Sequence, residues 1–456
     1  MNKFISGVTS GKRWLIGVIL LVIVLVLLLW LTPALLKAVP SRYVARLPEA
    51  VQTLGERGDG VPILPTVVAP MEAAVLLAEL ASPTPTIPAT AVSTPPTPTS
   101  IPVGSKRSSE LGVTPTNGLP TAVPPTTTPQ PIPDAMRLEG FQHIFQTWNN
   151  CGPATTAMVL SYFGLYLNQA DTAAVLKPNP EDRNVSPYQI TNYVNEQTPF
   201  AALDRTNGTL ETVKRLVAKG FPVVIELGIE PPGEYRWLGW YGHYLLVVAY
   251  DDALEQFWVY DSWFGTSDTP MENADKDGRI LTYADADNQW RQFNRSYITF
   301  YPPEQQAAVE DIIGEDMDDG IMWQKSLTRT QAALNLNADD PFLWFNLGTI
   351  YNEFGEYERA ATAFDQARAI GLPWRMLWYQ FGPYEAYYQV GRTEDVLLLT
   401  EVTLKDRPYF EESYYYQGLA QEVLGDVAAA RASFQKAVDF NPRFQPAVDA
   451  LTRLNK

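Results

Sequence analysis

Three side chains of this 456-residue chain can together carry out nucleophilic hydrolysis. Cys151 is the only cysteine, His243 is one of two histidines, and Asp261 follows shortly after that histidine. A cysteine thiolate attacks a carbonyl carbon, an imidazole takes up and returns the proton, and a carboxylate fixes the imidazole tautomer. Because a lone cysteine is more often a small buried apolar residue, the prediction depends on the elements that hold these three side chains.

The residues around Cys151 predict that it lies at the N-terminus of a helix. Pro153 suits the first turn of a helix, apolar residues recur with helical spacing over 154–163, and Gly164 provides a stop signal. The free backbone N–H groups and the dipole at such a terminus favour the thiolate, which is the nucleophilic form.

His243 and Asp261 belong to two apolar segments that predict an antiparallel hairpin. The segments are 241–250 and 257–261, joined by an acidic turn at Asp251 and Asp252. Asp252 lies the same number of residues after His243 as before Asp261. A turn centred on Asp252 would therefore place His243 and Asp261 directly opposite each other on neighbouring strands. The hairpin therefore predicts a carboxylate beside an imidazole.

Two further polar residues lie shortly before Cys151. Gln146 can donate a side-chain amide hydrogen bond to the oxyanion of a tetrahedral intermediate, with the Cys151 backbone N–H as the second donor. His143, slightly further upstream, is the competing general base. We expect His143 to be structural, because no carboxylate accompanies it in the sequence.

These motifs resemble the bacteriocin-processing cysteine peptidases, which cleave double-glycine leaders. The match consists of Gln146, the run Cys151-Gly-Pro-Ala, the run Gly242-His243-Tyr and Asp261, and it extends from near Phe141 to Tyr301. More closely, the chain is similar to the broad bacterial peptidase-like branch of this papain-like group. The resemblance implies Cys151 as nucleophile, His243 as general base and acid, Asp261 as the orienting carboxylate and Gln146 in the oxyanion hole.

The chain departs from that family in two places. Asp261 is followed by Ser262, where the family often has proline, and this departure puts the role of Asp261 in doubt. No G-x4-GK[ST] loop is present, whereas the classical members are fused to transporter ATPases. Cleavage of double-glycine leaders is therefore not implied, and the substrate stays open.

Residues 304–456 show successive helical patterns with an internal repeat. Phe364 follows Gly348 at the same spacing at which Phe434 follows Gly418, and the two glycines lie two repeat periods apart. This pattern resembles tetratricopeptide repeats, which implies a concave surface that holds a peptide or protein partner. We expect a degenerate copy between the two clear repeats, with Gly391 at its inter-helix turn.

The N-terminal region predicts a membrane anchor and a stalk. The apolar run within 14–36 extends about 27 Å as a helix, which matches the core of a bilayer, and no convincing signal-peptide cleavage site follows it. Basic residues on its two sides are nearly equal in number. Residues 82–134 are rich in Pro, Thr and Ser, which predicts an extended spacer. Because a stalk suits a cell surface, we expect the folded domains to be extracytoplasmic.

The expected fold class is a multi-domain chain. Its parts are an N-terminal tail at 1–13, a transmembrane anchor at 14–36, a juxtamembrane segment at 37–81, a disordered Pro/Thr-rich linker at 82–134, an α+β papain-like domain at 135–303 and an all-α tetratricopeptide solenoid at 304–456. The formal charge of −17 disfavours nucleic-acid binding. One cysteine excludes an internal disulfide and a cysteine-type metal cluster, and we expect no cofactor and no metal.

The leading interpretation is a membrane-anchored cysteine peptidase whose repeats bind a protein partner. A catalytically inactive surface adaptor, which uses both folded domains for binding, is the alternative from another functional class. A cell-wall peptide amidase or a transferase would use the same thioester chemistry, and the sequence leaves both open.

Overall fold

A computed structural model of the chain describes residues 63–65, 71–81, 131–147, 149–182, 184–231, 239–274 and 277–455. The anchor predicted at 14–36 and most of the linker predicted at 82–134 lie outside these residues. Among the helices that are described, none has the length and apolar character needed to cross a bilayer. Contacts group residues 63–229 and 241–456 into one compact unit, and all the elements below belong to it.

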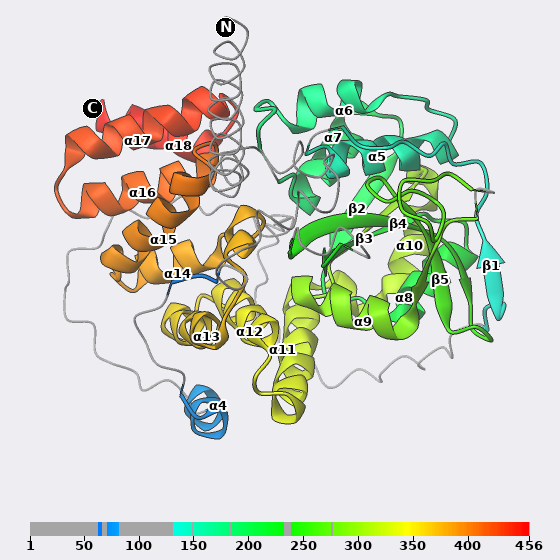
Figure 1. Cartoon of the computed structure of the whole chain (residues 1–456), viewed down its shortest axis with the longest axis horizontal. Helices are drawn as coiled ribbons and strands as arrows, with labels where there is room; N and C mark the ends of the chain where they lie inside the picture. Colours follow the sequence, from blue (N-terminus) through cyan, green and yellow to red (C-terminus); the bar gives the residue numbers. More distant parts are fainter. Residues whose placement is uncertain are drawn as a thin grey trace, which may run out of the picture. The chain divides into compact units, whose positions relative to one another are not determined.

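The first folded domain is built on an antiparallel sheet with the strand order β2-β7-β3-β4-β5-β6, and β1 pairs with β4 outside this path (Figure 1). The strands are β1 (Ala135–Arg137), β2 (Ala201–Arg205), β3 (Val223–Ile229), β4 (Tyr241–Asp251), β5 (Gln256–Asp261), β6 (Arg279–Thr282) and β7 (Tyr297–Tyr301). Strands β3 and β4 are apolar on both faces and buried along their length. Such strands require cover on both faces of the sheet.

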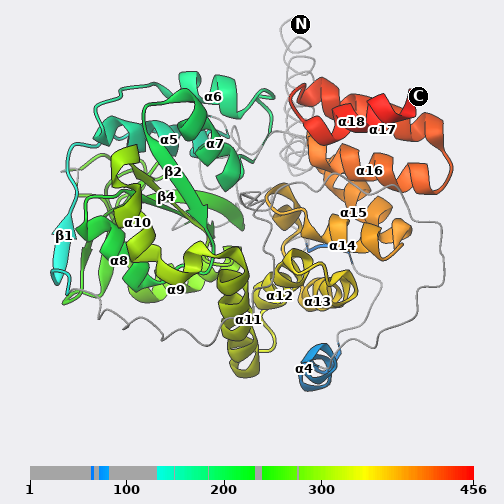
Figure 2. The ribbon, with the colours of Figure 1, turned by 180° about the vertical axis from the view of Figure 1, so that it is seen from behind.

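Helices provide that cover. They are α5 (Cys151–Tyr162), α6 (Gln169–Leu176), α7 (Pro187–Gln197), α8 (Leu210–Ala218) and α9 (Tyr283–Trp290), followed by the 3₁₀ turn η2 (Arg291–Phe293). Figures 1 and 2 show α5, α6 and α7 on one side of the sheet and α8 and α9 on the other. All residues of α5 from Gly152 to Ser161 are buried, so this helix is the centre of its layer. A papain-like α+β domain is therefore present.

The strand that follows α9 leads into the helical region. After β7, the elements are η3 (Pro303–Gln305), α10 (Gln306–Ile313), η4 (Gly314–Met317), α11 (Asp319–Leu336), α12 (Pro341–Glu353), α13 (Tyr357–Ile370), η5 (Trp374–Trp378), α14 (Gly382–Gln389), α15 (Thr393–Asp406), α16 (Glu411–Val423), α17 (Val427–Phe440) and α18 (Gln445–Leu454). Helix α10 contacts α8 of the first domain, and the helix pairs that repeat begin after it.

The repeats use small residues where two helices approach closely. A Cβ atom at Gly348 would lie 2.6 Å from the ring of Phe364, and one at Gly418 would lie 2.5 Å from the ring of Phe434. The degenerate repeat expected between them is α14 with α15, and Gly391 turns between these helices with φ of 74°. Its first helix begins later in the chain than a regular period would place it, because η5 is inserted before it.

Part of the segment predicted to be juxtamembrane is docked on the repeats. Leu64 donates its backbone N–H to the carbonyl of Leu372 at 2.9 Å, and the side-chain amide of Gln366 bonds both backbone groups of Met71. Helix α4 (Ala73–Ala81) follows, with Leu76 buried. The chain therefore contacts its repeats immediately before the Pro/Thr-rich segment begins.

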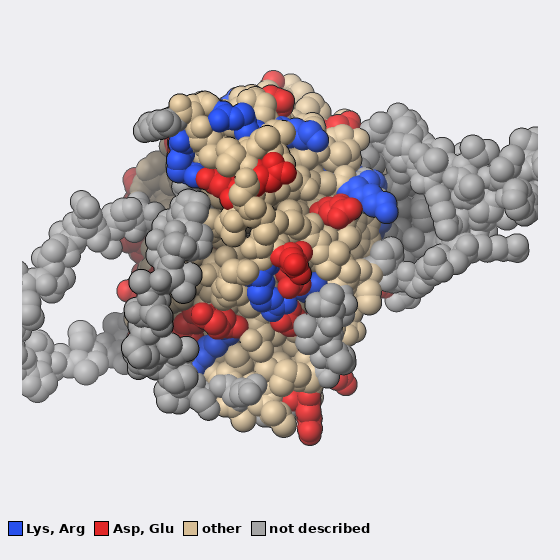
Figure 3. All heavy atoms as spheres, turned by 90° about the vertical axis from the view of Figure 1, so that its left-hand side faces the viewer, with Lys and Arg blue, Asp and Glu red and all other residues tan. Residues whose placement is uncertain are grey.

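The repeats also contact the α+β domain directly. Arg205 on β2 forms an ion pair with Asp319 on α11 at 2.6 Å, and Arg291 in η2 pairs with Asp340, the cap of α12, at 2.9 Å. On the face that Figure 3 shows, acidic and basic side chains lie next to one another in small groups, and the described residues of that face form no continuous basic surface.

Candidate active site

Cys151 occupies the first position of α5. The helix begins there because the carbonyl of Asn150 accepts the first intrahelical hydrogen bond, from Ala154 at 2.8 Å, and Pro153 lies in the first turn. The thiol is free and partly exposed, whereas the residues that follow it in the helix are buried. The prediction of a helix N-terminus at Cys151 is thus confirmed, and the terminus presents free N–H groups beside the sulfur atom.

His243 lies between Cys151 and Asp261. Its Nε2 atom is 2.8 Å from Oδ1 of Asp261, and its imidazole also interacts with the Cys151 side chain. Since Nε2 contacts the carboxylate, Nδ1 is the nitrogen left for the thiol. His243 and Asp261 are almost completely shielded from solvent. The three side chains named from the sequence therefore meet in one cluster.

The register of the hairpin differs from the expected one. Asp261 lies opposite Leu245, not opposite His243, and the register shifts between Val247 and Ala249. The pairs beside the turn, such as Asp251 with Gln256, centre the hairpin between Ala253 and Leu254 instead of on Asp252, and the extra residue of the bulge in β4 then shifts the register by one. His243 and Leu245 share a face of the strand, and the imidazole reaches the carboxylate diagonally across the pair.

Asp261 is held by more donors than the histidine alone. Its Oδ1 atom also accepts the backbone N–H groups of Trp263 at 2.8 Å and Phe264 at 3.0 Å. Its Oδ2 atom accepts a hydrogen bond from Arg279 on β6, again at 2.8 Å. Sequence reasoning missed Arg279, because no motif marks it and only the pairing of β6 with β5 brings it to the site.

The charges in the cluster reinforce one another. Burial alone would lower the pKa of His243, but the Asp261 carboxylate and the contact with Cys151 raise it to about 9. Burial alone would raise the pKa of Asp261, but His243 and Arg279 hold it well below its usual range. At neutral pH the imidazole is therefore protonated and the carboxylate is ionised, as an imidazolium–carboxylate pair requires.

Gln146 is fixed by the residue that departs from the family pattern. The Ser262 hydroxyl donates to Oε1 of Gln146 at 2.8 Å, and the Ser262 carbonyl accepts the Gln146 backbone N–H at 2.7 Å. Because Oε1 is engaged, the NH₂ group of Gln146 is the part left to act as a donor. The serine after Asp261 thus connects the loop before α5 to the end of β5.

His143 contacts the backbone of Asp261 but not its carboxylate. Its Nε2 atom lies 2.8 Å from the backbone carbonyl of Asp261, and its ring packs edge-on against Phe145 and Tyr260. Burial lowers the pKa of His143, which disfavours a charged ring there. These contacts are those of a structural residue.

Aromatic side chains line the region beside His243. The ring of Trp263 lies 6.0 Å from the imidazole and 5.4 Å from the ring of Tyr241. Two residues of η5 complete this group, since Trp378 lies 6.3 Å from Tyr241 and the Arg375 guanidinium lies 4.1 Å above the Tyr241 ring. The insertion between two repeats therefore contacts the beginning of the strand that carries His243.

The described residues form no evident metal centre. Among them, no group of three or more His, Cys, Asp or Glu side chains is arranged to hold a metal ion.

Comparisons with known proteins assign both folded regions. Residues 138–298 match the Peptidase_C39 like family, and residues 343–367 and 412–443 match two tetratricopeptide repeat families. No curated protein sequence matches the chain significantly.

Solved structures similar to parts of the chain are of two kinds. One, described as a putative C39-like peptidase from Bacillus anthracis, is 16% identical with a TM-score of 0.28, and the match covers 36% of this chain and 96% of that one. Another is MamA, from residue 41 to its end, from Desulfovibrio magneticus RS-1. It is 21% identical with a TM-score of 0.27, and the match covers 29% of this chain and 75% of that one.

Proposed function

From a Peptidase_C39-like domain joined to tetratricopeptide repeats in one chain, we propose that this protein is a membrane-anchored cysteine peptidase. Cys151 is the nucleophile, His243 the general base and acid, Asp261 the orienting carboxylate and Gln146 an oxyanion donor. The observation that carries the proposal is the contact of His243 with Cys151 on one side and, at 2.8 Å, with Asp261 on the other.

The reaction follows from the charges of the cluster. The Cys151 thiolate adds to the carbonyl carbon of a peptide bond, and the negative charge moves to the carbonyl oxygen. The Cys151 N–H and the Gln146 NH₂ group donate to that oxygen. His243 gives its proton to the departing amine, and the C–N bond breaks to leave a thioester. Water then attacks the thioester while His243 takes up a proton from it, and cleavage of the C–S bond releases the acid and restores the Cys151 thiolate beside the protonated imidazole.

The other regions of the chain localise this activity. The tetratricopeptide repeats are a protein-interaction module, and in this proposal they bind the substrate or a partner protein. The apolar segment at 14–36 anchors the chain in the cell membrane, with the folded domains outside the cytoplasm. An amidase or a transferase on cell-wall peptides would form the same thioester, so profiling with peptide and cell-wall substrates separates these reactions.

The test is the rate at which a thiol-directed electrophile labels Cys151 in the full-length chain at pH 7. The proposal predicts fast labelling that slows at least tenfold in His243→Ala, because the thiolate loses its charged partner. His143→Ala is the matched control and should label at the parent rate. A parent rate equal to that of an unfolded cysteine peptide, unchanged by His243→Ala, would favour the inactive adaptor.

A further inference from the structure

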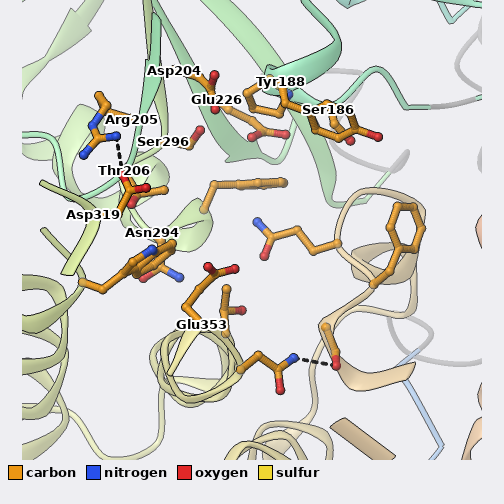
Figure 4. Close-up of a pocket in the computed structure, with 18 of the residues that line it drawn as sticks. Ser186, Tyr188, Asp204, Arg205, Thr206, Glu226, Asn294, Ser296, Asp319 and Glu353 are labelled. Atoms are coloured by element: carbon orange, nitrogen blue, oxygen red, sulfur yellow. Dashed lines mark hydrogen bonds and ion pairs between the residues drawn. The ribbon is translucent and has the colours of Figure 1, made fainter. Parts of the chain in front are cut away.

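A second site lies where the α+β domain meets the repeats. It is a cavity of about 280 Å³ whose walls come from the start of α7, β2, β3 and the residues after α9 on one side and from α11, α12, α14 and α16 on the other (Figure 4). Exposed residues Asp319 and Gly320 are part of its lining, which places an opening at the start of α11. Cys151, His243 and Asp261 are not among the residues that line it.

The cavity is strongly acidic. Its only basic lining residue among those described is Arg205, whose guanidinium is bound by Asp319 at 2.6 Å. The carboxylates of the lining are Asp204, Glu226, Asp319, Glu353 and Glu385. Burial and the proximity of Asp204 raise the pKa of Glu226 to about 8, although the polar side chains of Ser296 and Tyr244 act to lower it. A cation that enters the cavity would favour the ionised form of Glu226, and carboxyl groups outnumber guanidinium groups in the described lining.

The remaining walls are suited to the stem and head of a basic side chain. They are mainly aromatic, with Phe293, Trp323, Phe354, Tyr379 and Phe381. Aromatic faces attract ammonium and guanidinium groups, and apolar walls also accommodate the methylene stem of lysine or arginine. Carboxylates among aromatic rings thus select an organic cation.

Two amide side chains of the lining have atoms without a hydrogen-bond partner. Asn294, which is 6% exposed, has an unpartnered Nδ2 donor. Asn352 donates its Nδ2 to the carbonyl of Gly382 at 2.9 Å, but its Oδ1 acceptor is unpartnered. Buried polar atoms are rarely left without a hydrogen-bond partner. A ligand with both an acceptor and a donor would therefore provide the missing partners of these two atoms.

We propose that this cavity binds a basic residue of a polypeptide. Its ammonium or guanidinium group lies among the carboxylates and Asn352, and a backbone carbonyl of the same residue accepts a hydrogen bond from Asn294. A free polyamine has the charge but no carbonyl, and it would leave Asn294 unpartnered. The site does not use Cys151, so it stands whether or not the chain hydrolyses peptide bonds.

Isothermal titration calorimetry on the full-length chain tests this site with four probes. N-acetyl-lysine and N-acetyl-arginine N-methylamides are expected to bind, and the norleucine analogue, which lacks the charge, should bind at least tenfold more weakly. Putrescine should bind more weakly than the lysine amide. Equal or tighter binding of putrescine would make a free amine the ligand and would overturn the peptide assignment. Equal binding of the norleucine analogue, or no binding of any cation at millimolar concentration, would overturn the site.

Variants locate the binding. Glu353→Gln should weaken the binding of the lysine amide about tenfold, which is the effect expected for the loss of one charged hydrogen bond. Glu358→Gln, an exposed carboxylate on α13 outside the cavity, is the matched control and should bind as the parent does. Asn294→Gly keeps the left-handed backbone at φ of 49°. This variant should weaken the binding of the lysine amide but not the binding of putrescine. Unchanged affinity in both Glu353→Gln and Asn294→Gly would overturn the proposal.

One further variant separates this site from the reaction proposed above. Cys151→Ser should bind the lysine amide with the parent affinity although it cannot be labelled. Weaker binding in Cys151→Ser would mean that the probe occupies the catalytic cleft, which would overturn a separate site.

Discussion

The hydroxyl of Ser262 donates a hydrogen bond to the side-chain carbonyl of Gln146 at 2.8 Å, although the two residues are far apart in the chain. Ser262 directly follows Asp261, so one turn holds both the orienting carboxylate and the candidate oxyanion donor. The serine that departs from the family pattern is therefore connected to the site.

This contact predicts the effect of removing each partner. Gln146→Ala should lower kcat/KM about 100-fold, as loss of an oxyanion donor does in other acyl-transfer enzymes. Ser262→Ala should lower kcat/KM about tenfold, because the Gln146 amide is still present but has lost the hydrogen bond that positions it. Steady-state kinetics on a peptide substrate should show that the double variant is no worse than Gln146→Ala alone. Additive losses would mean that Ser262 does not act through Gln146.

Arg279 should stabilise the buried Asp261 carboxylate. The pKa of Asp261 is lowered in the folded protein, so its contribution to stability is complete above the unfolded pKa and is lost only as the pH falls through the folded pKa, which lies well below it. Arg279→Met should therefore cost about 2 kcal/mol of unfolding free energy at pH 7, and most of this cost should remain near pH 3, because the folded carboxylate is still ionised there. Denaturant unfolding of the parent and the variant at both pH values measures the cost.

The control for Arg279 is an arginine of similar exposure. Arg359 has 20% of its side chain exposed, against 17% for Arg279, but it pairs with Glu356, which is 38% exposed. Arg359→Met should cost well under about 1 kcal/mol, because an ion pair in solvent contributes little. Equal costs for the two variants at pH 7 would contradict the role given to Arg279.

Glu226 should make the protein less stable as the pH rises. The pKa of Glu226 is about 8 in the folded chain, against an ordinary value of 4.5, and burial is the main cause. Because the folded state holds the proton more tightly, the stabilisation is complete below pH 4.5 and is lost as the pH approaches 8. Glu226→Gln should be more stable than the parent at pH 8.5 by on the order of 3 kcal/mol, and the exposed Glu358→Gln should not. If the unfolding free energies of the parent and of Glu226→Gln instead change equally between pH 5 and 8, the role given to Glu226 is wrong.

The docked segment before the linker predicts how the chain responds to cutting. After cleavage at a protease site inserted near residue 110, the N-terminal fragment should remain bound to the repeats through Leu64, Met71 and α4. Leu76→Asp should release that fragment, because Leu76 is 1% exposed, whereas Val75→Asp should not, because Val75 is 51% exposed. Co-purification on an N-terminal tag measures the association. Release of the fragment from the cut parent chain would contradict the docking.

Much of the site could be predicted from local sequence. Pro153 and Gly164 mark the ends of the helix that begins at Cys151, and the two apolar segments around Asp252 predict the β4–β5 hairpin. These signals are local, because they depend on turn and helix chemistry within a few residues. The repeated glycine and phenylalanine spacings likewise express a contact inside one helix pair.

The parts that could not be predicted depend on long-range pairing. The position of the turn between β4 and β5 and the bulge near Val248 together set the offset between His243 and Asp261, and no residue type in β4 predicts either of them. Arg279 reaches Asp261 only because β6 pairs with β5. The docking of Leu64 depends on backbone groups of the turn at Leu372, which leave no pattern in the sequence.

The most direct test of the central claim is the protonation of His243. The chain has only two histidines, so NMR of the full-length protein with labelled imidazole rings, assigned with His143→Ala, can follow each ring separately. The account predicts that His243 stays protonated until its pKa of about 9, that His143 titrates below the usual range, and that Cys151→Ser lowers the midpoint of His243. If both rings lose their protons at or below pH 6.5, and Cys151→Ser changes neither, the thiol and the imidazole do not form the charged pair on which the proposed reaction depends.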